Sequence, residues 1–168
     1  MTKDEYTQGV DDWADSAYRF ALRCGGTEET SKDAVQEAFA TLWEQRSKVT
    51  FDKGRAFVLT VVHRQVANHY RHQQKVTPMP QNTACEPAED TKAEQFDMRN
   101  IVAQCMDQLL PQQRAILQLR DADGLSYKEI GNILSLSDQQ VMVYIYRARV
   151  AMKKQLLAFG IESMEQII

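Results

Sequence analysis

A short stretch near the C-terminus contains the same serine-based spacing twice. Ser126 is followed three residues later by Glu129, and Ser137 is followed three residues later by Gln140. Each pair fits a capping box, in which a serine caps a helix and the third residue reaches back to the serine. The spacing predicts two helices joined by a tight turn, with Gly131 where close packing needs a residue without bulk. This is the arrangement of a helix-turn-helix, whose second helix enters the major groove of DNA.

A second candidate surface lies in the stretch 56–75, whose residues fall on two opposite faces when they are placed at helical spacing. Valines fill one face, while the opposite face is polar and basic, contains no acid, and has Phe57 near its start. Cations neutralise phosphates, and an aromatic ring stacks on an unpaired base with about 1–3 kcal/mol. The pattern fits single-stranded or distorted DNA, and it fits an exposed basic helix face equally well. The residues of this basic ridge are Thr60, Arg64, Asn68, Arg71 and Lys75.

The remaining reactive side chains predict neither catalysis nor metal binding. His69 and His72 are three residues apart, but we expect His69 to face the core, and the helix offers no acidic ligand beside them. The three cysteines are widely spaced, which favours reduced thiols over a disulfide or a zinc site. No nucleophile and base occur at a plausible spacing. We therefore expect no metal, no cofactor and no enzymatic activity.

The composition predicts an all-α protein. Among 168 residues there are only 7 glycines and 4 prolines, and β-type alternation is nowhere sustained. The longest apolar run, 58–62, is interrupted by Thr60, so we expect no insertion into a membrane. The N-terminus lacks a signal peptide, which predicts a cytoplasmic location. The net charge of −3 argues against a nucleic-acid binder that acts alone.

Residues 76–97 separate two small helical domains. This segment holds three of the four prolines and five acids against one base, and it predicts a flexible acidic linker. The domains are then 1–75 and 98–168, each small enough to need a partner for stability. The expected helices and loops, by residue number, are helices 12–24, 32–48, 56–75, 98–110 and 112–124, a break at 25–31 and a polar loop at 50–55.

Taken together, the motifs resemble the extracytoplasmic-function group of bacterial sigma factors, the short members of the sigma-70 family. DAVQEAFATLW at 33–43 and LLPQQRAILQLRDADGLSYKEIG at 109–131 carry the likeness, which covers about 13–156. The resemblance implies an alternative sigma factor that binds core RNA polymerase and directs promoter-specific initiation. It also implies contacts with the β′ clamp helices and the β flap, binding of promoter DNA, and an anti-sigma partner.

The resemblance also assigns roles to residues. The region that docks on the clamp helices matches Asp33, Gln36, Glu37 and Phe39. The −10 surface comprises Phe57, Thr60, Arg64, Asn68, Arg71 and Lys75. The −35 helix and its flank comprise Ser137, Gln139, Gln140, Val143, Tyr144, Arg147 and Arg149.

Two of the cations expected in the −35 helix are missing, because 140–144 reads QVMVY where the family usually has threonine, valine, lysine, serine and arginine. Base readout would therefore depend on the amides of Gln139 and Gln140, which suit adenine, and on Val143 against thymine methyl groups.

Two other classes remain open at the level of sequence. One is a stand-alone helix-turn-helix regulator whose N-terminal domain dimerises or binds a ligand. The other is a sigma mimic or antagonist without promoter function. This alternative is consistent with the apolar residues Met142, Val143 and Tyr144 in a helix where cations are expected.

Overall fold

The computed structural model describes residues 1–76 and 98–161, and this part of the chain is built from helices and short connections. The expected all-α class is confirmed. The predicted linker, apart from Val76, lies outside the described residues, as does Cys85. The elements are α1 Lys3–Arg23, α2 Glu28–Glu44, α3 Phe51–Val76, α4 Met98–Asp107, α5 Pro111–Leu117, a π turn η1 Gln118–Ala122, α6 Tyr127–Leu134 and α7 Asp138–Ala158.

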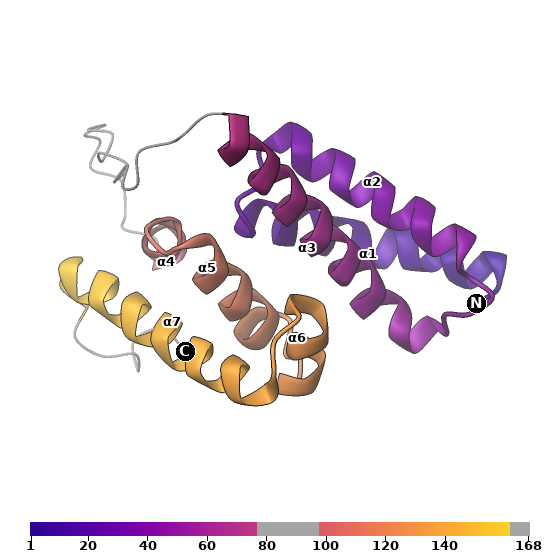
Figure 1. The fold of residues 1–168 in the computed structure, drawn as a ribbon. Helices are drawn as coiled ribbons and strands as arrows, with labels where there is room; N and C mark the ends of the chain where they lie inside the picture. The colour runs from indigo at the N-terminus through magenta and orange to yellow at the C-terminus, as the bar shows by residue number, and fades with distance from the viewer. Residues whose placement is uncertain (77–97, 162–168) are drawn as a thin grey trace.

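Helices α1, α2 and α3 form the N-terminal lobe, and α4 to α7 form the C-terminal lobe (Figure 1). In the N-terminal lobe, Phe20, Leu42 and Val62 are fully buried, one from each helix. The valine face predicted for α3 is confirmed as a core face. None of the described helices has the length and apolar character needed to cross a membrane.

Helix boundaries in the N-terminal lobe differ from the sequence-based expectation. Helix α3 begins at Phe51, and Gly54 lies inside it rather than in a loop. The reason is Trp13 of α1: a Cβ at Gly54 would lie 2.6 Å from the Trp13 ring, so glycine allows the two helices to touch. Helix α2 begins at Glu28, because the side chain of Thr27 caps it.

The C-terminal lobe packs α5, η1 and α6 against α7. Its fully buried residues include Ile116, Leu119, Ile130 and Val141. At η1 the helix widens by one residue, and the Asp123 N–H donates to the Gln118 carbonyl at 2.9 Å. The predicted end of this helical stretch at Gly124 is close to the observed one.

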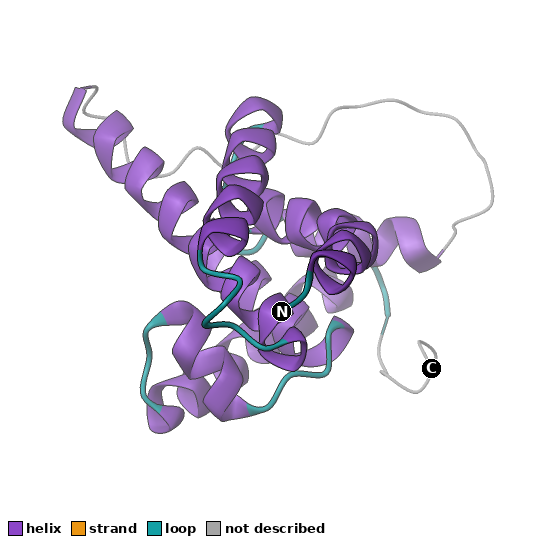
Figure 2. Cartoon of the chain, turned by 90° about the vertical axis from the view of Figure 1, so that its right-hand side faces the viewer, coloured by secondary structure: helices purple, strands orange, loops and turns teal. Residues whose placement is uncertain are grey.

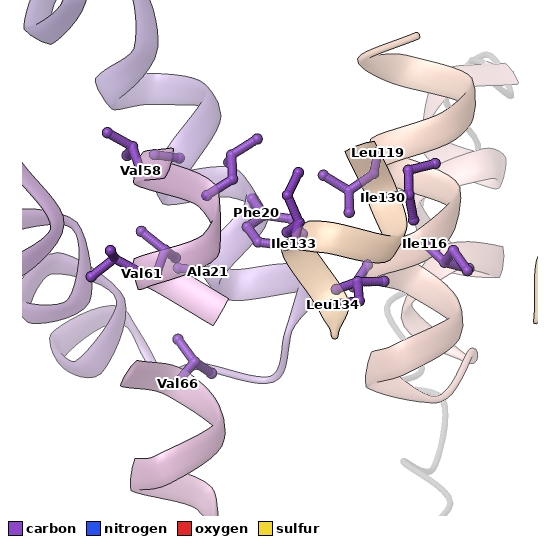
Figure 3. Close-up of a cluster of buried hydrophobic side chains, with 14 of the residues drawn as sticks. Phe20, Ala21, Val58, Val61, Val66, Ile116, Leu119, Ile130, Ile133 and Leu134 are labelled. Atoms are coloured by element: carbon purple, nitrogen blue, oxygen red, sulfur yellow. The ribbon is translucent and has the colours of Figure 1, made fainter. Parts of the chain in front are cut away.

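The two lobes share one hydrophobic core, in which α6 packs on α3 and α5 packs near α1. Figure 3 shows Ile133 of α6 beside Phe20 and Ala21 of α1. An ion pair of 2.5 Å joins Arg55 of α3 to Asp123 after η1, and the Asp123 side chain is only 9% exposed. Figure 2 shows the described helices and the short loops between them from the side. The described chain is therefore one packed body.

Candidate nucleic-acid interface

The helix-turn-helix predicted from the two capping boxes is present as α6 and α7. The Ser126 N–H donates to the Glu129 carboxylate at 2.8 Å, and the Glu129 N–H donates to the Ser126 hydroxyl at 3.3 Å. The hydrogen bonds from Ser126, with that of the side chain first, lower the pKa of Glu129. A charged carboxylate at this helix N-terminus is also favoured by the helix dipole.

The turn between the helices is tight because of one serine and one glycine. Ser135 adopts the left-handed conformation at φ 57°, and the Leu136 N–H donates to the Gly131 carbonyl at 2.9 Å. A Cβ at Gly131 would lie 2.6 Å from the Leu136 carbonyl oxygen. The small residue predicted at this position is therefore required by the backbone of the turn.

The first turns of α7 present most of the predicted −35 residues to solvent. Val141 and Ile145 face the core, and Met142 and Val143 between them are exposed. Tyr144 is half-buried and lines a hollow of about 160 Å³ with Leu110 and Arg147. The exposed predicted residues are Ser137, Gln139, Gln140, Val143, Arg147 and Arg149.

Three of these exposed residues already have intramolecular partners, because Ser137 and Gln140 bond to each other in the helix cap and Arg149 pairs with Asp121. The Gln140 side-chain carbonyl accepts the Ser137 N–H at 2.9 Å, so it belongs to the helix cap. The Arg149 guanidinium donates to Asp121 at 2.6 Å, and this hydrogen bond raises the pKa of Arg149. Gln139 and Arg147 are consequently the better placed polar side chains for contact with DNA.

Part of the predicted basic ridge of α3 is exposed to solvent. Arg64, Asn68 and Arg71 are exposed, whereas Thr60 is half-buried and its hydroxyl donates to the Ala56 carbonyl at 2.7 Å. Phe57 is half-buried against the core. The backbone of Lys75 lies in α3, and its side chain is outside the described part.

Asn68 and Arg71 border two separate hollows, so the ridge is not one continuous strip. Asn68 lines a hollow of about 500 Å³ between α2 and α3, together with Asp33, Glu37 and His69. Arg71 lines a hollow of about 360 Å³ between the lobes. The first hollow places the acids predicted to dock on polymerase next to a residue predicted to read the −10 element.

The side chains of His69 on α3 and Phe39 on α2 differ in their exposure. His69 was expected to face the core, but it is exposed, because the buried face of α3 is centred on its valines. Phe39 is only 8% exposed and packs edge-on against Tyr6, so its ring supports α2 from the inside. Asp33, Gln36 and Glu37 are exposed on α2.

The hollow between the lobes contains two titratable groups, Cys24 and His63, whose pKa values are changed by burial. Burial raises the pKa of the Cys24 thiol to about 12, against a smaller lowering effect of Arg114. Burial and then the positive charge of Arg71 lower the pKa of His63. A thiol held in its protonated form is a poor nucleophile. Within the described residues, no three acidic, histidine or cysteine side chains gather as a metal site would require.

Sequence reasoning missed the ionic contacts that join the lobes. Arg55 and Asp123 are 68 residues apart, and Gln118 adds a hydrogen bond to Asp123 at 3.3 Å. Arg23 also approaches Asp107 at 3.5 Å. No local pattern marks such pairs.

The fold defines a helical protein with a helix-turn-helix in its C-terminal lobe, and comparison with known proteins identifies the family. Residues 10–76 match Sigma-70 region 2, and residues 99–152 match Sigma-70 region 4. The resemblance drawn from the sequence is confirmed: the chain belongs to the sigma-70 family of RNA polymerase sigma factors.

Relatives of known name lie within the same family. The ECF RNA polymerase sigma factor SigE of Mycolicibacterium smegmatis is 30% identical over 162 residues, which are 90% of this chain and 62% of SigE. This chain thus spans less than two thirds of that relative. The RNA polymerase sigma factor YlaC of Bacillus subtilis is 28% identical over 135 residues, covering 76% of this chain and 78% of YlaC.

A solved structure has a similar fold. The sigma factor RpoE from Bartonella quintana, crystallised with the anti-sigma factor NepR, superimposes with a TM-score of 0.70. The match covers 92% of this chain and 98% of RpoE at 18% sequence identity. At this identity the likeness is one of fold.

Proposed function

We propose that this chain is an alternative sigma factor that binds core RNA polymerase and directs initiation at promoters with matching −10 and −35 elements. The observation that carries the proposal is the presence of sigma-70 regions 2 and 4 on one chain, with an exposed α7 in a capped helix-turn-helix. It acts as a cytoplasmic, non-enzymatic binding protein.

Each of three segments of the chain performs one part of this function. Residues 1–75 dock on the polymerase and hold the −10 region, residues 76–97 form the linker, and residues 98–168 read the −35 element. In the docking step, Asp33 and Glu37 of α2 face cationic side chains of the clamp helices, with Gln36 beside them. Such charge complementarity sets the orientation and the rate of association.

On DNA, the exposed cations Arg64 and Arg71 of α3 contact phosphates, and Asn68 offers an amide to a base. On α7, Gln139 suits adenine and Val143 suits a thymine methyl group. Because the chain is net acidic and α7 has no cation before Arg147, each half binds DNA weakly alone. Tethering both halves to the polymerase raises their effective concentration at the promoter, and this compensates for the weak affinity of each half.

Run-off transcription with core polymerase and a panel of promoters tests the proposal. Transcripts that start at defined promoters only when this chain is present are the expected result. Absence of such transcripts, with retained binding to core polymerase, favours a sigma mimic, as the apolar surface of α7 would allow. Failure to bind core polymerase favours a stand-alone regulator.

A matched pair of variants tests the docking surface. Glu37→Lys reverses a charge in the hollow between α2 and α3, and we expect it to weaken binding to core polymerase and to lower transcript yield. Glu44→Lys makes the same change at the exposed end of α2, away from that hollow, and serves as the control. Equal affinity of the two variants places the docking surface elsewhere.

A further inference from the structure

The hollow between the lobes has the size of a small-molecule site. Its volume is about 360 Å³, and its wall combines residues of α3 in the N-terminal lobe with residues of α5 and α6 in the C-terminal lobe. Ligand pockets commonly lie between domains and start at about 300 Å³. At about 30 Å³ for each water molecule, this hollow fits a ligand of about a dozen non-hydrogen atoms.

Apolar side chains form much of the wall. They are Ala67 of α3, Leu110 and Pro111 at the start of α5, Ala115 of α5 and Leu134 of α6. Ala115 and Leu134 belong to the shared core, whereas Leu110 is 67% exposed. The apolar part of a ligand in the hollow would cover Leu110, and the burial of apolar surface stabilises such a complex.

The polar groups of the wall include one charged group, the guanidinium of Arg71. Burial raises the pKa of the Cys24 thiol to about 12, so the thiol stays protonated. Burial, followed by the charge of Arg71, lowers the pKa of His63 from 6.5, so its imidazole is neutral at neutral pH. None of the described residues that line the hollow is acidic. Arg71 also forms no ion pair with any acid in the described part of the chain.

Arg114 adds positive charge close to the hollow. Its charge acts on the Cys24 thiol, against the larger effect of burial on the pKa of that thiol. Its Nε is buried and makes no hydrogen bond within the described residues. Asp107 lies 3.8 Å from Arg114 and 3.5 Å from Arg23, so two cations share one acid. The surroundings of the hollow therefore favour an anion.

We propose that the hollow between the lobes binds a small carboxylate with an apolar body of about seven to ten carbon atoms. The carboxylate pairs with Arg71, and the neutral imidazole of His63 offers one further hydrogen-bond donor. The apolar body packs against Leu110, Pro111 and Leu134. A carboxylate suits this wall better than a phosphate, because one guanidinium matches one negative charge and the apolar residues offer no donors for a second.

The ligand has a consequence for the lobes, because residues of both lobes form its site. The site exists only while the lobes are in contact, so the ligand shifts the equilibrium toward the closed form. It also occupies Arg71, which the proposed function assigns to a phosphate contact. This consequence rests on the proposed function. The binding itself does not, and it is measured without polymerase or DNA.

Isothermal titration calorimetry of the full chain tests the binding with two probes, 2-naphthoate and octanoate, which distinguish an aryl acid from an acyl acid. At least one of them should bind saturably at a single site. Its neutral amide, 2-naphthamide or octanamide, has the same apolar body and should bind about tenfold more weakly. No saturable binding of either acid at millimolar concentration, or equal binding of acid and amide, overturns the proposal.

Two variants locate the site, each with a matched control. Ala67→Leu fills the hollow without a change of charge and should weaken binding about tenfold or more. Ala103→Leu makes the same change at an exposed position of α4 that does not line the hollow, and its affinity should equal that of the wild type.

Arg71→Gln removes the charge of the wall and should weaken binding of the acid about tenfold, with little effect on the amide. Arg64→Gln removes an exposed cation two turns earlier on α3, outside the hollow, and should bind the acid as the wild type does. Circular dichroism checks that all four variants fold. Wild-type affinity of Ala67→Leu or Arg71→Gln for the acid overturns the proposal.

Run-off transcription separates the binding from its consequence. Under the proposed function, a saturating concentration of the bound acid should reduce the transcripts made with the wild-type chain, and Ala67→Leu should resist this reduction. If the chain binds the acid but directs no transcription even without it, the proposed function is contradicted and the binding site is still supported.

Discussion

Arg147 is the first cation along α7, and it is exposed beside Tyr144. Arg147→Ala should weaken binding of the polymerase complex to promoter DNA several-fold. It should also lower the slope of log affinity against log salt by about 1, because one phosphate contact disappears. Filter binding or anisotropy over a range of salt concentrations measures both quantities.

Lys48→Ala is the control for Arg147→Ala, since it removes an exposed cation from the loop after α2. Its salt slope should match that of the wild type. An unchanged slope in Arg147→Ala removes Arg147 from the phosphate contacts.

His63 makes the stability of the fold depend on pH. It lies in the hollow between the lobes with Cys24 and Arg71, and burial followed by Arg71 lowers its pKa from 6.5. The unfolded chain therefore takes up a proton at higher pH than the folded chain does. The unfolding free energy should decrease as pH falls below 6.5, until the folded form is also protonated.

His63→Gln should flatten this part of the pH profile. Chemical denaturation of the wild type and the variant, compared between about pH 5 and pH 8, measures the difference. Carboxylates that lose hydrogen bonds at low pH, such as Glu129, affect both proteins equally. Parallel profiles for the two proteins would contradict a role for His63.

At the scale of elements, the turn between α6 and α7 depends on Gly131. Gly131→Ala places a Cβ against the Leu136 carbonyl oxygen, which belongs to the backbone and can move only if the turn opens. We expect a loss of about 1–3 kcal/mol in unfolding free energy, as for other overpacked sites. Affinity for the −35 element should fall as well, because α7 changes its direction.

Asn132→Ala is the control for this turn, because Asn132 is the exposed neighbour of Gly131. Thermal and chemical denaturation should show little change for it. Equal stability of the two variants would show that the turn tolerates a side chain.

Some elements could be predicted from local sequence, and others could not. The caps at Ser126 and Ser137 were predictable, because each capping group lies within three residues of its partner. The role of Gly54 was not, because it depends on Trp13, which belongs to another helix.

The same limit applies to the candidate site. The resemblance to the family assigned Arg147 to the −35 surface. It did not predict that Asp121 holds Arg149, since those residues are 28 positions apart and are joined only by the fold. The capping-box spacing did predict that the Gln140 side chain is part of the cap at Ser137.

At the scale of the whole molecule, the contact between the lobes limits what the closed form can reach. Elements centred near −10 and −35 are about 25 base pairs apart, which is about 85 Å of duplex. The longest helix, α3, has 26 residues and a length of about 39 Å. Under the proposed function, two lobes that share one core have to separate before they read both elements.

The Arg55–Asp123 pair should help to hold the lobes together. Arg55→Asp or Asp123→Arg leaves like charges facing each other at a nearly buried position, so each should open the lobes. Small-angle X-ray scattering should show a larger radius of gyration for each single variant. The double variant, with the charges exchanged, should return toward the wild-type value.

Lys32→Glu is the control for the lobe contact, because it reverses an exposed cation that pairs with Glu28 within α2. Its scattering should equal that of the wild type. If the single variants at Arg55 and Asp123 also scatter like the wild type, apolar packing alone keeps the lobes closed.

The π turn η1 accommodates one extra residue without turning the chain that follows. Its bond from the Asp123 N–H to the Gln118 carbonyl spans five residues, where an α-helix spans four. Each kind of turn closes about one full rotation, so deleting one residue here would let an ordinary α-helix form and would leave the direction of α6 nearly unchanged. In this family member, a single-residue deletion at η1 is therefore a shortening of a helix rather than a change of lobe orientation.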